Sequence, residues 1–146
     1  MTNKTNYIMS QLRKCRNKSF ESYAINRIIS KIDRYDLKFI CQQHIQLPKG
    51  RALTDLYFPQ LGIHIEVDEG HHLSQEESDA LREADIINAT SHVIIRIPVT
   101  DKKKRILDID EFNVYIDESI TQLELRLKEL EDSNEFVPWK GNEHTS

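Results

Sequence analysis

Two short segments on either side of a PQLG turn constrain the fold of this 146-residue chain most strongly. Residues 52–59 (ALTDLYFP) and 63–68 (IHIEVD) alternate apolar and polar side chains as β-strands do, and the proline and glycine between them favour a turn. These features predict an antiparallel hairpin with a four-residue loop. Its register pairs Phe58 with Ile63, Tyr57 with His64, Leu56 with Ile65, and Asp55 with Glu66.

The two faces of this hairpin differ in chemistry. Period-two alternation places Leu56, Phe58, Ile63, Ile65 and Val67 on one face, and Asp55, Tyr57, His64, Glu66 and Asp68 on the other. The apolar face is the predicted core side. The three carboxylates on the second face repel one another unless a cation lies among them. The alternative is that they are solvated residues on the outside of an edge hairpin.

A divalent metal is the cation that such a cluster predicts. Carboxylate oxygens are hard ligands that favour Mg²⁺ or Mn²⁺ and leave positions for water and phosphate. A metal held in this way supports phosphodiester hydrolysis by an activated water. His71 and His72 follow Gly70 and could act as general base or acid, although ordinary surface histidines account for each of them equally well.

Two charged residues from other segments could reach this site. Glu21 lies near the start of a helix predicted over 19–32, where it could orient a metal-bound water or simply be an exposed first-turn glutamate favoured by the helix dipole. Arg96 lies in a predicted buried strand, residues 92–99 (HVIIRIPV), where it could face DNA or form a structural ion pair with a carboxylate.

The remaining periodicities complete an α/β fold with α+β character, in which helices flank a mixed central sheet. A polar N-terminal arm could form one helix, residues 37–48 resemble a strand, and a capping box of Ser74 and Glu77 predicts a helix over 74–90. Apolar residues from Ile109 to Leu130 form one stripe of a long helix. The stripe lasts only about three heptads, so core packing is favoured over a coiled-coil dimer.

Charge is divided unevenly along the chain. Residues 1–51 carry 11 Lys and Arg against 3 Asp and Glu, whereas residues 52–146 carry 9 against 21. This division predicts a basic face that could meet a polyanion, although a solvated charged surface explains the charges alone equally well. The residues that we expect to contact DNA phosphates are Lys14, Arg16, Lys18, Lys49, Arg51, Lys102, Lys103, Lys104 and Arg105.

Cysteine content and hydropathy exclude several classes of protein. Cys15 and Cys41 are too few for a disulfide framework and match no redox motif, so we interpret both as small apolar fillers. There is no apolar run of about 18 residues and no signal-peptide pattern at the start, so the expected location is the cytoplasm.

The ordered set TDLYFPQLGIHIEVDEGHH, SDALREADII and HVIIRIPV resembles the PD-(D/E)XK nuclease superfamily, particularly its Vsr-like branch. With FESYAINRI and FICQQHIQL, the resemblance narrows to the nuclease domain of the AbaSI and PvuRts-type modification-dependent restriction endonucleases, over most of residues 5–130. It implies a restriction-endonuclease-like fold and a Mg²⁺- or Mn²⁺-dependent DNA endonuclease from a bacterial or phage-related source.

The resemblance also implies roles for particular residues. Asp55 and Glu66 match the two motif acids that bind metal, and Glu21 matches an early-helix glutamate. Asp68 occupies the usual lysine position, where it could bind or position the metal instead, with His71 or His72 transferring the proton. This departure keeps open a catalytically silent DNA-binding module. A metallohydrolase of small esters that uses Asp55, Glu66 and His64 is a third interpretation.

The resemblance finally implies a domain plan. Residues 1–132 are the expected nuclease domain, and residues 133–146 are the expected start of a linker or a C-terminal tail. In the family an SRA-like domain follows and reads 5-hydroxymethylcytosine or its glucosylated form, and we expect this domain to be missing here. The implied substrate is double-stranded DNA, and a homodimer is plausible because double-strand cleavage needs two active sites.

Overall fold

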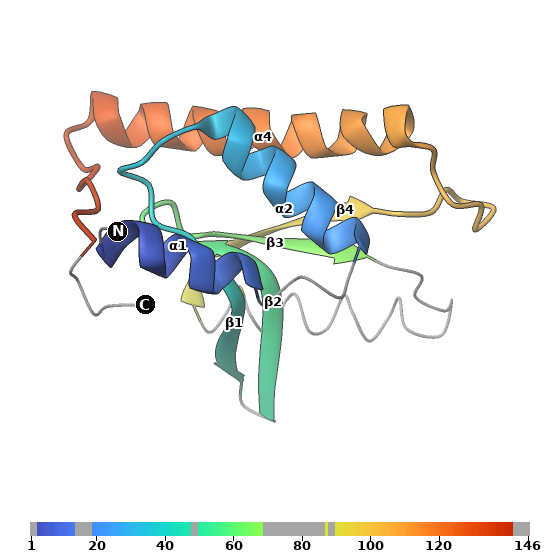
Figure 1. Ribbon diagram of the computed structural model, residues 1–146, viewed down its shortest axis with the longest axis horizontal. Helices are drawn as coiled ribbons and strands as arrows, with labels where there is room; N and C mark the ends of the chain where they lie inside the picture. Colours follow the sequence, from blue (N-terminus) through green and yellow to red (C-terminus); the bar gives the residue numbers. More distant parts are fainter. Residues whose placement is uncertain (1–2, 14–18, 48–49, 69–86, 88–89, 142–146) are drawn as a thin grey trace.

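The computed structural model describes residues 3–13, 19–47, 50–68, 87 and 90–141. In chain order the elements are α1 (Asn3–Arg13), α2 (Ser19–Ile32), β1 (Ile40–Leu47), β2 (Gly50–Phe58), β3 (Ile63–Asp68), β4 (Val93–Pro98) and α4 (Ile109–Asp132) (Figure 1). Each corresponds to a segment predicted from the sequence. The helix predicted over 74–90 falls almost entirely outside the described residues.

The four described strands form one mixed sheet in the order β1-β2-β3-β4. β1 pairs antiparallel with β2, β2 pairs antiparallel with β3, and β3 pairs parallel with β4. Three of the four predicted hairpin pairs are confirmed: Leu56 with Ile65, Tyr57 with His64, and Phe58 with Ile63. The mixed sheet predicted from the sequence is therefore correct.

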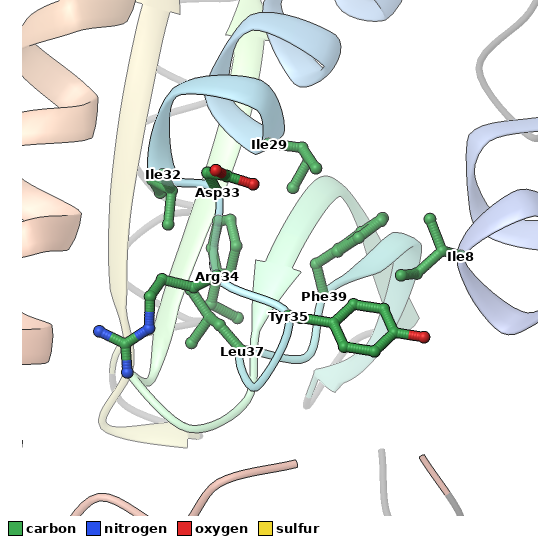
Figure 2. A pocket seen from close by; sticks show the side chains of 9 residues that line it. Ile8, Ile29, Ile32, Asp33, Arg34, Tyr35, Leu37 and Phe39 are labelled. Carbon is green, nitrogen blue, oxygen red and sulfur yellow. The ribbon is translucent and has the colours of Figure 1, made fainter. Parts of the chain in front are cut away.

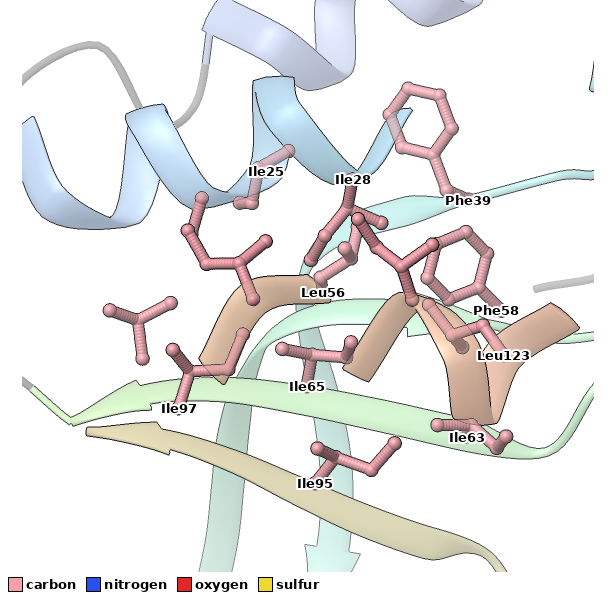
Figure 3. Close-up of a cluster of buried hydrophobic side chains, with 14 of the residues drawn as sticks. Ile25, Ile28, Phe39, Leu56, Phe58, Ile63, Ile65, Ile95, Ile97 and Leu123 are labelled. Carbon is pink, nitrogen blue, oxygen red and sulfur yellow. The ribbon is translucent and has the colours of Figure 1, made fainter. Parts of the chain in front are cut away.

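Helices α2 and α4 cover one face of the sheet, as Figures 1 and 3 show. Ile25 and Ile28 of α2 and Leu123 of α4 are fully buried against the strands. The five residues predicted for the apolar face of the hairpin all belong to this core: Leu56, Phe58, Ile63, Ile65 and Val67. Burial of this continuous apolar surface is the main favourable term for the fold.

Helix α4 begins at a capping box in which Asp108 accepts from the Glu111 N–H and the Glu111 side chain accepts from the Asp108 N–H. Its apolar stripe is buried from Phe112 to Leu130, which confirms core packing for this helix. Ile109 is the exception, because it lies at the first turn and is 54% exposed. None of the helices in the described ranges is long and apolar enough to cross a membrane.

The segment after α4 folds back onto the domain. The backbone N–H of Trp139 donates to the Asp36 carbonyl at 2.8 Å. The Trp139 ring packs edge-on against Tyr7 of α1, with ring centroids 5.2 Å apart. Phe136 packs against the main core. Phe136 and Trp139 thus contribute to the packing of the domain. Cys41 is fully buried in the core, as its interpretation as an apolar filler requires, and Cys15 lies outside the described residues.

Candidate active site

The predicted acidic hairpin residues lie where β2 parts from β3. Pairing between the two strands ends at Leu56 and Ile65, so the fourth predicted pair, Asp55 with Glu66, is not part of the ladder. The Asp55 carboxylate instead accepts a hydrogen bond from the Val67 N–H at 2.8 Å. The Asp55 side-chain oxygen therefore accepts the hydrogen bond that a backbone carbonyl of a paired strand would otherwise accept. This bond fixes the Asp55 carboxylate beside the end of β3.

Side-chain alternation changes at this level of the β1–β2 hairpin. Cys41 and Leu56 face the main core. Ile45 is four residues after Cys41 in β1, so strand alternation predicts that it faces the same core. It packs instead in a separate cluster with Ile94. Thr54, two residues from Leu56, bonds to His64. The alternation predicted from the sequence therefore holds from Leu56 to Val67, whereas the Asp55 carboxylate is bonded to the backbone of β3.

The cation found beside Glu66 is a guanidinium group. Parallel pairing places Glu66 level with Arg96 of β4, and Arg96 Nη1 lies 3.1 Å from Glu66 Oε2. Glu66 is only 6% exposed, so its charge would be costly without a partner. Of the two roles considered for Arg96, the ion pair with a carboxylate is the one observed.

Glu21 is buried, in contrast to the exposed first-turn glutamate that we weighed for it. It is 1% exposed in the first turn of α2, and Gln42 Nε2 of β1 donates to its Oε2 at 2.9 Å. Sequence analysis did not single out Gln42, since a glutamine in a strand carries no particular signal. What marks it is the backbone, because Gln42 adopts a left-handed φ of 59° within β1.

His64 belongs to a chain of hydrogen bonds on the face of the sheet away from the main core, where it is itself buried. Its Nδ1 bonds to Thr54 Oγ1 at 2.8 Å and its Nε2 to His92 Nδ1 at 3.0 Å, while His92 Nε2 lies 3.3 Å from the Tyr57 hydroxyl. The His64 ring stacks on Tyr57 at 4.1 Å. Burial, and to a lesser degree the nearby His92, lowers the pKa of His64 to about 4.

Both ring nitrogens of His64 are therefore engaged within the protein, and the imidazole is neutral at physiological pH. A metal ligand needs one nitrogen lone pair directed at the ion. This geometry argues against the metallohydrolase interpretation in which His64 binds metal together with Asp55 and Glu66.

The described acidic residues are candidate oxygen ligands for a metal. Within the part of the chain that the structure covers, no three His, Cys, Asp or Glu side chains gather as a metal-binding group. Asp55 and Glu66 nevertheless provide oxygen donors from adjoining strands, and Asp68 lies at the end of β3, partly exposed. Mg²⁺ is commonly held by one or two carboxylates together with water and phosphate oxygens. His71 and His72 fall outside the described residues.

Some of the predicted phosphate contacts lie on exposed turns. Asp101 organises the turn between β4 and α4 by accepting from the Lys103 and Arg105 N–H groups. These backbone bonds and the Arg105 guanidinium lower the pKa of Asp101. Lys102, Lys103 and Lys104 are exposed on this turn, whereas Arg105 pairs with Asp101 and Glu111.

At the other basic segment, Arg51 is exposed at the start of β2. The remaining residues predicted to contact phosphate lie outside the described ranges: Lys14, Arg16, Lys18 and Lys49.

A small apolar hollow of about 120 Å³ lies at the opposite end of α2 from Glu21 (Figure 2). Its walls include Ile8 of α1, Ile29 of α2, and Phe39 and Phe58, with Tyr35 at its edge. None of the predicted catalytic residues lines it. The predicted catalytic residues and this hollow are therefore separate features of the domain.

A mixed sheet with helices packed on one face, and acidic side chains where a hairpin parts from the next strand, defines a restriction-endonuclease-like domain. Residues 5–124 match the family described as restriction endonuclease PvuRts1 I-like, N-terminal. The chain belongs to this family.

A solved structure supports the same assignment. The chain is similar to the 5-hydroxymethylcytosine-specific restriction enzyme AbaSI, with 38% sequence identity and a TM-score of 0.75. The match covers 93% of this chain and 50% of the AbaSI chain, so the chain spans about half the length of this relative. Comparison with curated proteins finds no significant match.

Proposed function

We propose that this chain is the DNA-cleaving domain of a modification-dependent restriction endonuclease and that it hydrolyses phosphodiester bonds with Mg²⁺ or Mn²⁺. The observation that carries the proposal is the Asp55 carboxylate held on the Val67 amide at the end of the strand that bears Glu66. Asp55 and Glu66 belong to adjoining strands of a chain whose family is one of restriction endonucleases, and this supports the proposal.

Asp55 and Glu66 would hold the metal. When bound, such an ion neutralises the scissile phosphate and lowers the pKa of a coordinated water. The Val67 N–H restricts rotation of the Asp55 carboxylate, so that this ligand is oriented before substrate binds. Glu21 would orient the attacking water. Asp68 would position the metal or its water, and His71 or His72 would transfer the proton.

The proposed substrate is double-stranded DNA. AbaSI is described as specific for 5-hydroxymethylcytosine, and the half of AbaSI that this chain does not match is where we place an SRA-like reader of that base. The domain itself would contact phosphates through Arg51 and Lys102–Lys104, with little base preference and a steep salt dependence. Cleavage of both strands would require a second active site, supplied by a homodimer.

One observation favours a second candidate function, a catalytically silent DNA-binding module. Arg96 already supplies a positive charge to Glu66, and Asp68 stands where the motif of the PD-(D/E)XK superfamily usually has lysine. A site whose charge is balanced without metal has less need to bind one. The two functions predict different results for removal of the Asp55 carboxylate. A nuclease would lose DNA cleavage, whereas a silent module would show no change in any measured cleavage.

The test is a nicking assay with the 146-residue chain on plain and 5-hydroxymethylated duplexes, in Mg²⁺, Mn²⁺ or EDTA. We expect metal-dependent nicking that falls by about 100-fold or more in Asp55→Asn and Glu66→Gln. Asp132→Asn, an exposed aspartate at the end of α4, is the matched control and should retain the wild-type rate. EDTA-resistant nicking, or equal rates for wild type and Asp55→Asn, would contradict the proposal.

A further inference from the structure

We propose that Gln42 is a positioning residue of this site, whose carboxamide holds the Glu21 carboxylate at the level of the hairpin where Asp55 lies. The inference rests on the proposed nuclease function and adds to it a residue that neither the sequence motif nor the comparisons identify. Three observations support it: the backbone of Gln42, its place in the hairpin, and its contact with Glu21.

The backbone of Gln42 is unusual for its place in the fold. Five non-glycine residues in the described ranges have positive φ. Four of them lie at helix ends or in turns: Asp33, Ser91, Lys104 and Asn134. Gln42 alone among them lies inside a strand. A left-handed conformation is unfavourable for glutamine, and such strain persists only where the surrounding structure holds it, often at functional sites.

The strained residue lies at the level of Asp55. Cys41 pairs with Leu56 and Gln43 pairs with Thr54, so Gln42 and Asp55 occupy the level between these two pairs. This is also the level at which β2 loses its pairing with β3. The left-handed turn of Gln42 therefore coincides with the change of face in β1 and directs its side chain to the start of α2.

The contact that Gln42 makes suits an acid that acts at a metal site. Glu21 is nearly fully buried, so its carboxylate needs hydrogen-bond donors to remain ionised. Gln42 Nε2 supplies such a donor at 2.9 Å without adding a positive charge. An arginine or lysine would orient the carboxylate as well but would compete with a metal or a developing positive charge. Because Gln42 is a neutral donor, this hydrogen bond orients Glu21 without itself neutralising the carboxylate charge.

The test compares Gln42→Gly with Asn134→Gly. Glycine relieves left-handed strain at both positions, but only Gln42→Gly also removes the hydrogen bond to Glu21. We expect Gln42→Gly to fold with a melting temperature close to that of the wild type and to lose about 10-fold or more in kcat for nicking, with KM for DNA unchanged. Asn134→Gly should match the wild type in both parameters.

A double-mutant cycle with Glu21→Gln separates positioning from a general effect on packing. If Gln42 acts through Glu21, adding Gln42→Gly to Glu21→Gln causes little further loss of kcat. Should Gln42→Gly fail to fold, Gln42→Asn replaces it, since asparagine tolerates positive φ and its carboxamide is one methylene too short to reach Glu21. The same loss is expected.

Two results distinguish failure of this inference from failure of the proposed function. An active wild type whose Gln42 variants keep the wild-type kcat, or lose it equally in the Glu21→Gln background, would overturn the role of Gln42 alone. A wild type without metal-dependent nicking would overturn the nuclease proposal, and the role of Gln42 with it.

Discussion

Acidification from neutral pH should destabilise this domain through His64. The folded state keeps His64 neutral, because burial lowers its pKa from 6.5 to about 4. The unfolded chain binds a proton near pH 6.5, so it holds more protons than the folded state between these two values. The stability that His64 contributes is therefore fully present above pH 6.5 and is lost as the pH falls toward 4.

The size of the effect follows from the two pKa values. Each unit of pKa difference corresponds to about 1.4 kcal/mol, so the full loss is about 3 kcal/mol, of which roughly 2 kcal/mol falls between pH 7 and pH 5. His92, whose pKa is also lowered by burial, changes stability in the same direction. Paired carboxylates such as Asp36 and Asp117 have lowered pKa values, so their effect on the pH dependence of stability appears only at more acidic pH.

Urea unfolding at pH 7, 6 and 5 measures this loss. As the pH falls from 7 to 5, the free energy of unfolding of the wild type should decrease with an unchanged m-value. The decrease should be much smaller in His64→Gln, which retains polar groups near Thr54 and His92. His44→Gln is the matched control, because His44 is exposed on β1 and its replacement should leave the wild-type dependence intact. A flat wild-type profile, or equal slopes in wild type and His64→Gln, would refute the reasoning.

Three further perturbations test the packing and the charges of the domain. Arg96→Met should lower the free energy of unfolding by about 2 kcal/mol, because it leaves the buried Glu66 carboxylate without its guanidinium. Added Mn²⁺ should raise the melting temperature of this variant more than that of the wild type. An equal metal-induced shift in the two proteins would contradict a metal site at Glu66. Leu123→Ala should cost about 3 kcal/mol in urea unfolding, since Leu123 is fully buried between α4 and the sheet, and a cost below that of an exposed-site control, Leu125→Ala, would show that the packing is wrong. Asp108→Ala should cost about 1 kcal/mol by removing the cap of α4, with no cost expected for Asp110→Ala beyond a small dipole effect.

Local patterns were sufficient to predict most of the fold. The register from Leu56 to Ile65 follows from the PQLG loop and period-two alternation, and the α4 stripe follows from helical spacing. These predictions are correct because burying an apolar face is the dominant requirement on such segments, and that requirement is readable in consecutive residues. Ile109 was the exception in α4, since spacing alone does not show where the core ends.

The site was only partly accessible to the same reasoning. Glu66, Asp55 and Glu21 were identified as candidates, but the sequence could not show that Asp55 bonds to the Val67 amide or that Glu21 is buried. Both facts belong to the part of the sheet where β2–β3 pairing ends at Leu56 and Ile65 and where the Gln42 backbone is left-handed. A backbone angle of this kind has no counterpart in composition or periodicity.

The sequence by itself determined most of the residues that face the core, the order of the elements, and the acids available for a metal. Side-chain type and spacing are local properties that set burial, and burial selects the fold. Only the tertiary structure decided how the acids are held: Arg96 beside Glu66, the Val67 amide on Asp55, and Gln42 on Glu21. Each of these contacts joins different elements of the fold, so its geometry exists only once the strands and α2 have packed together.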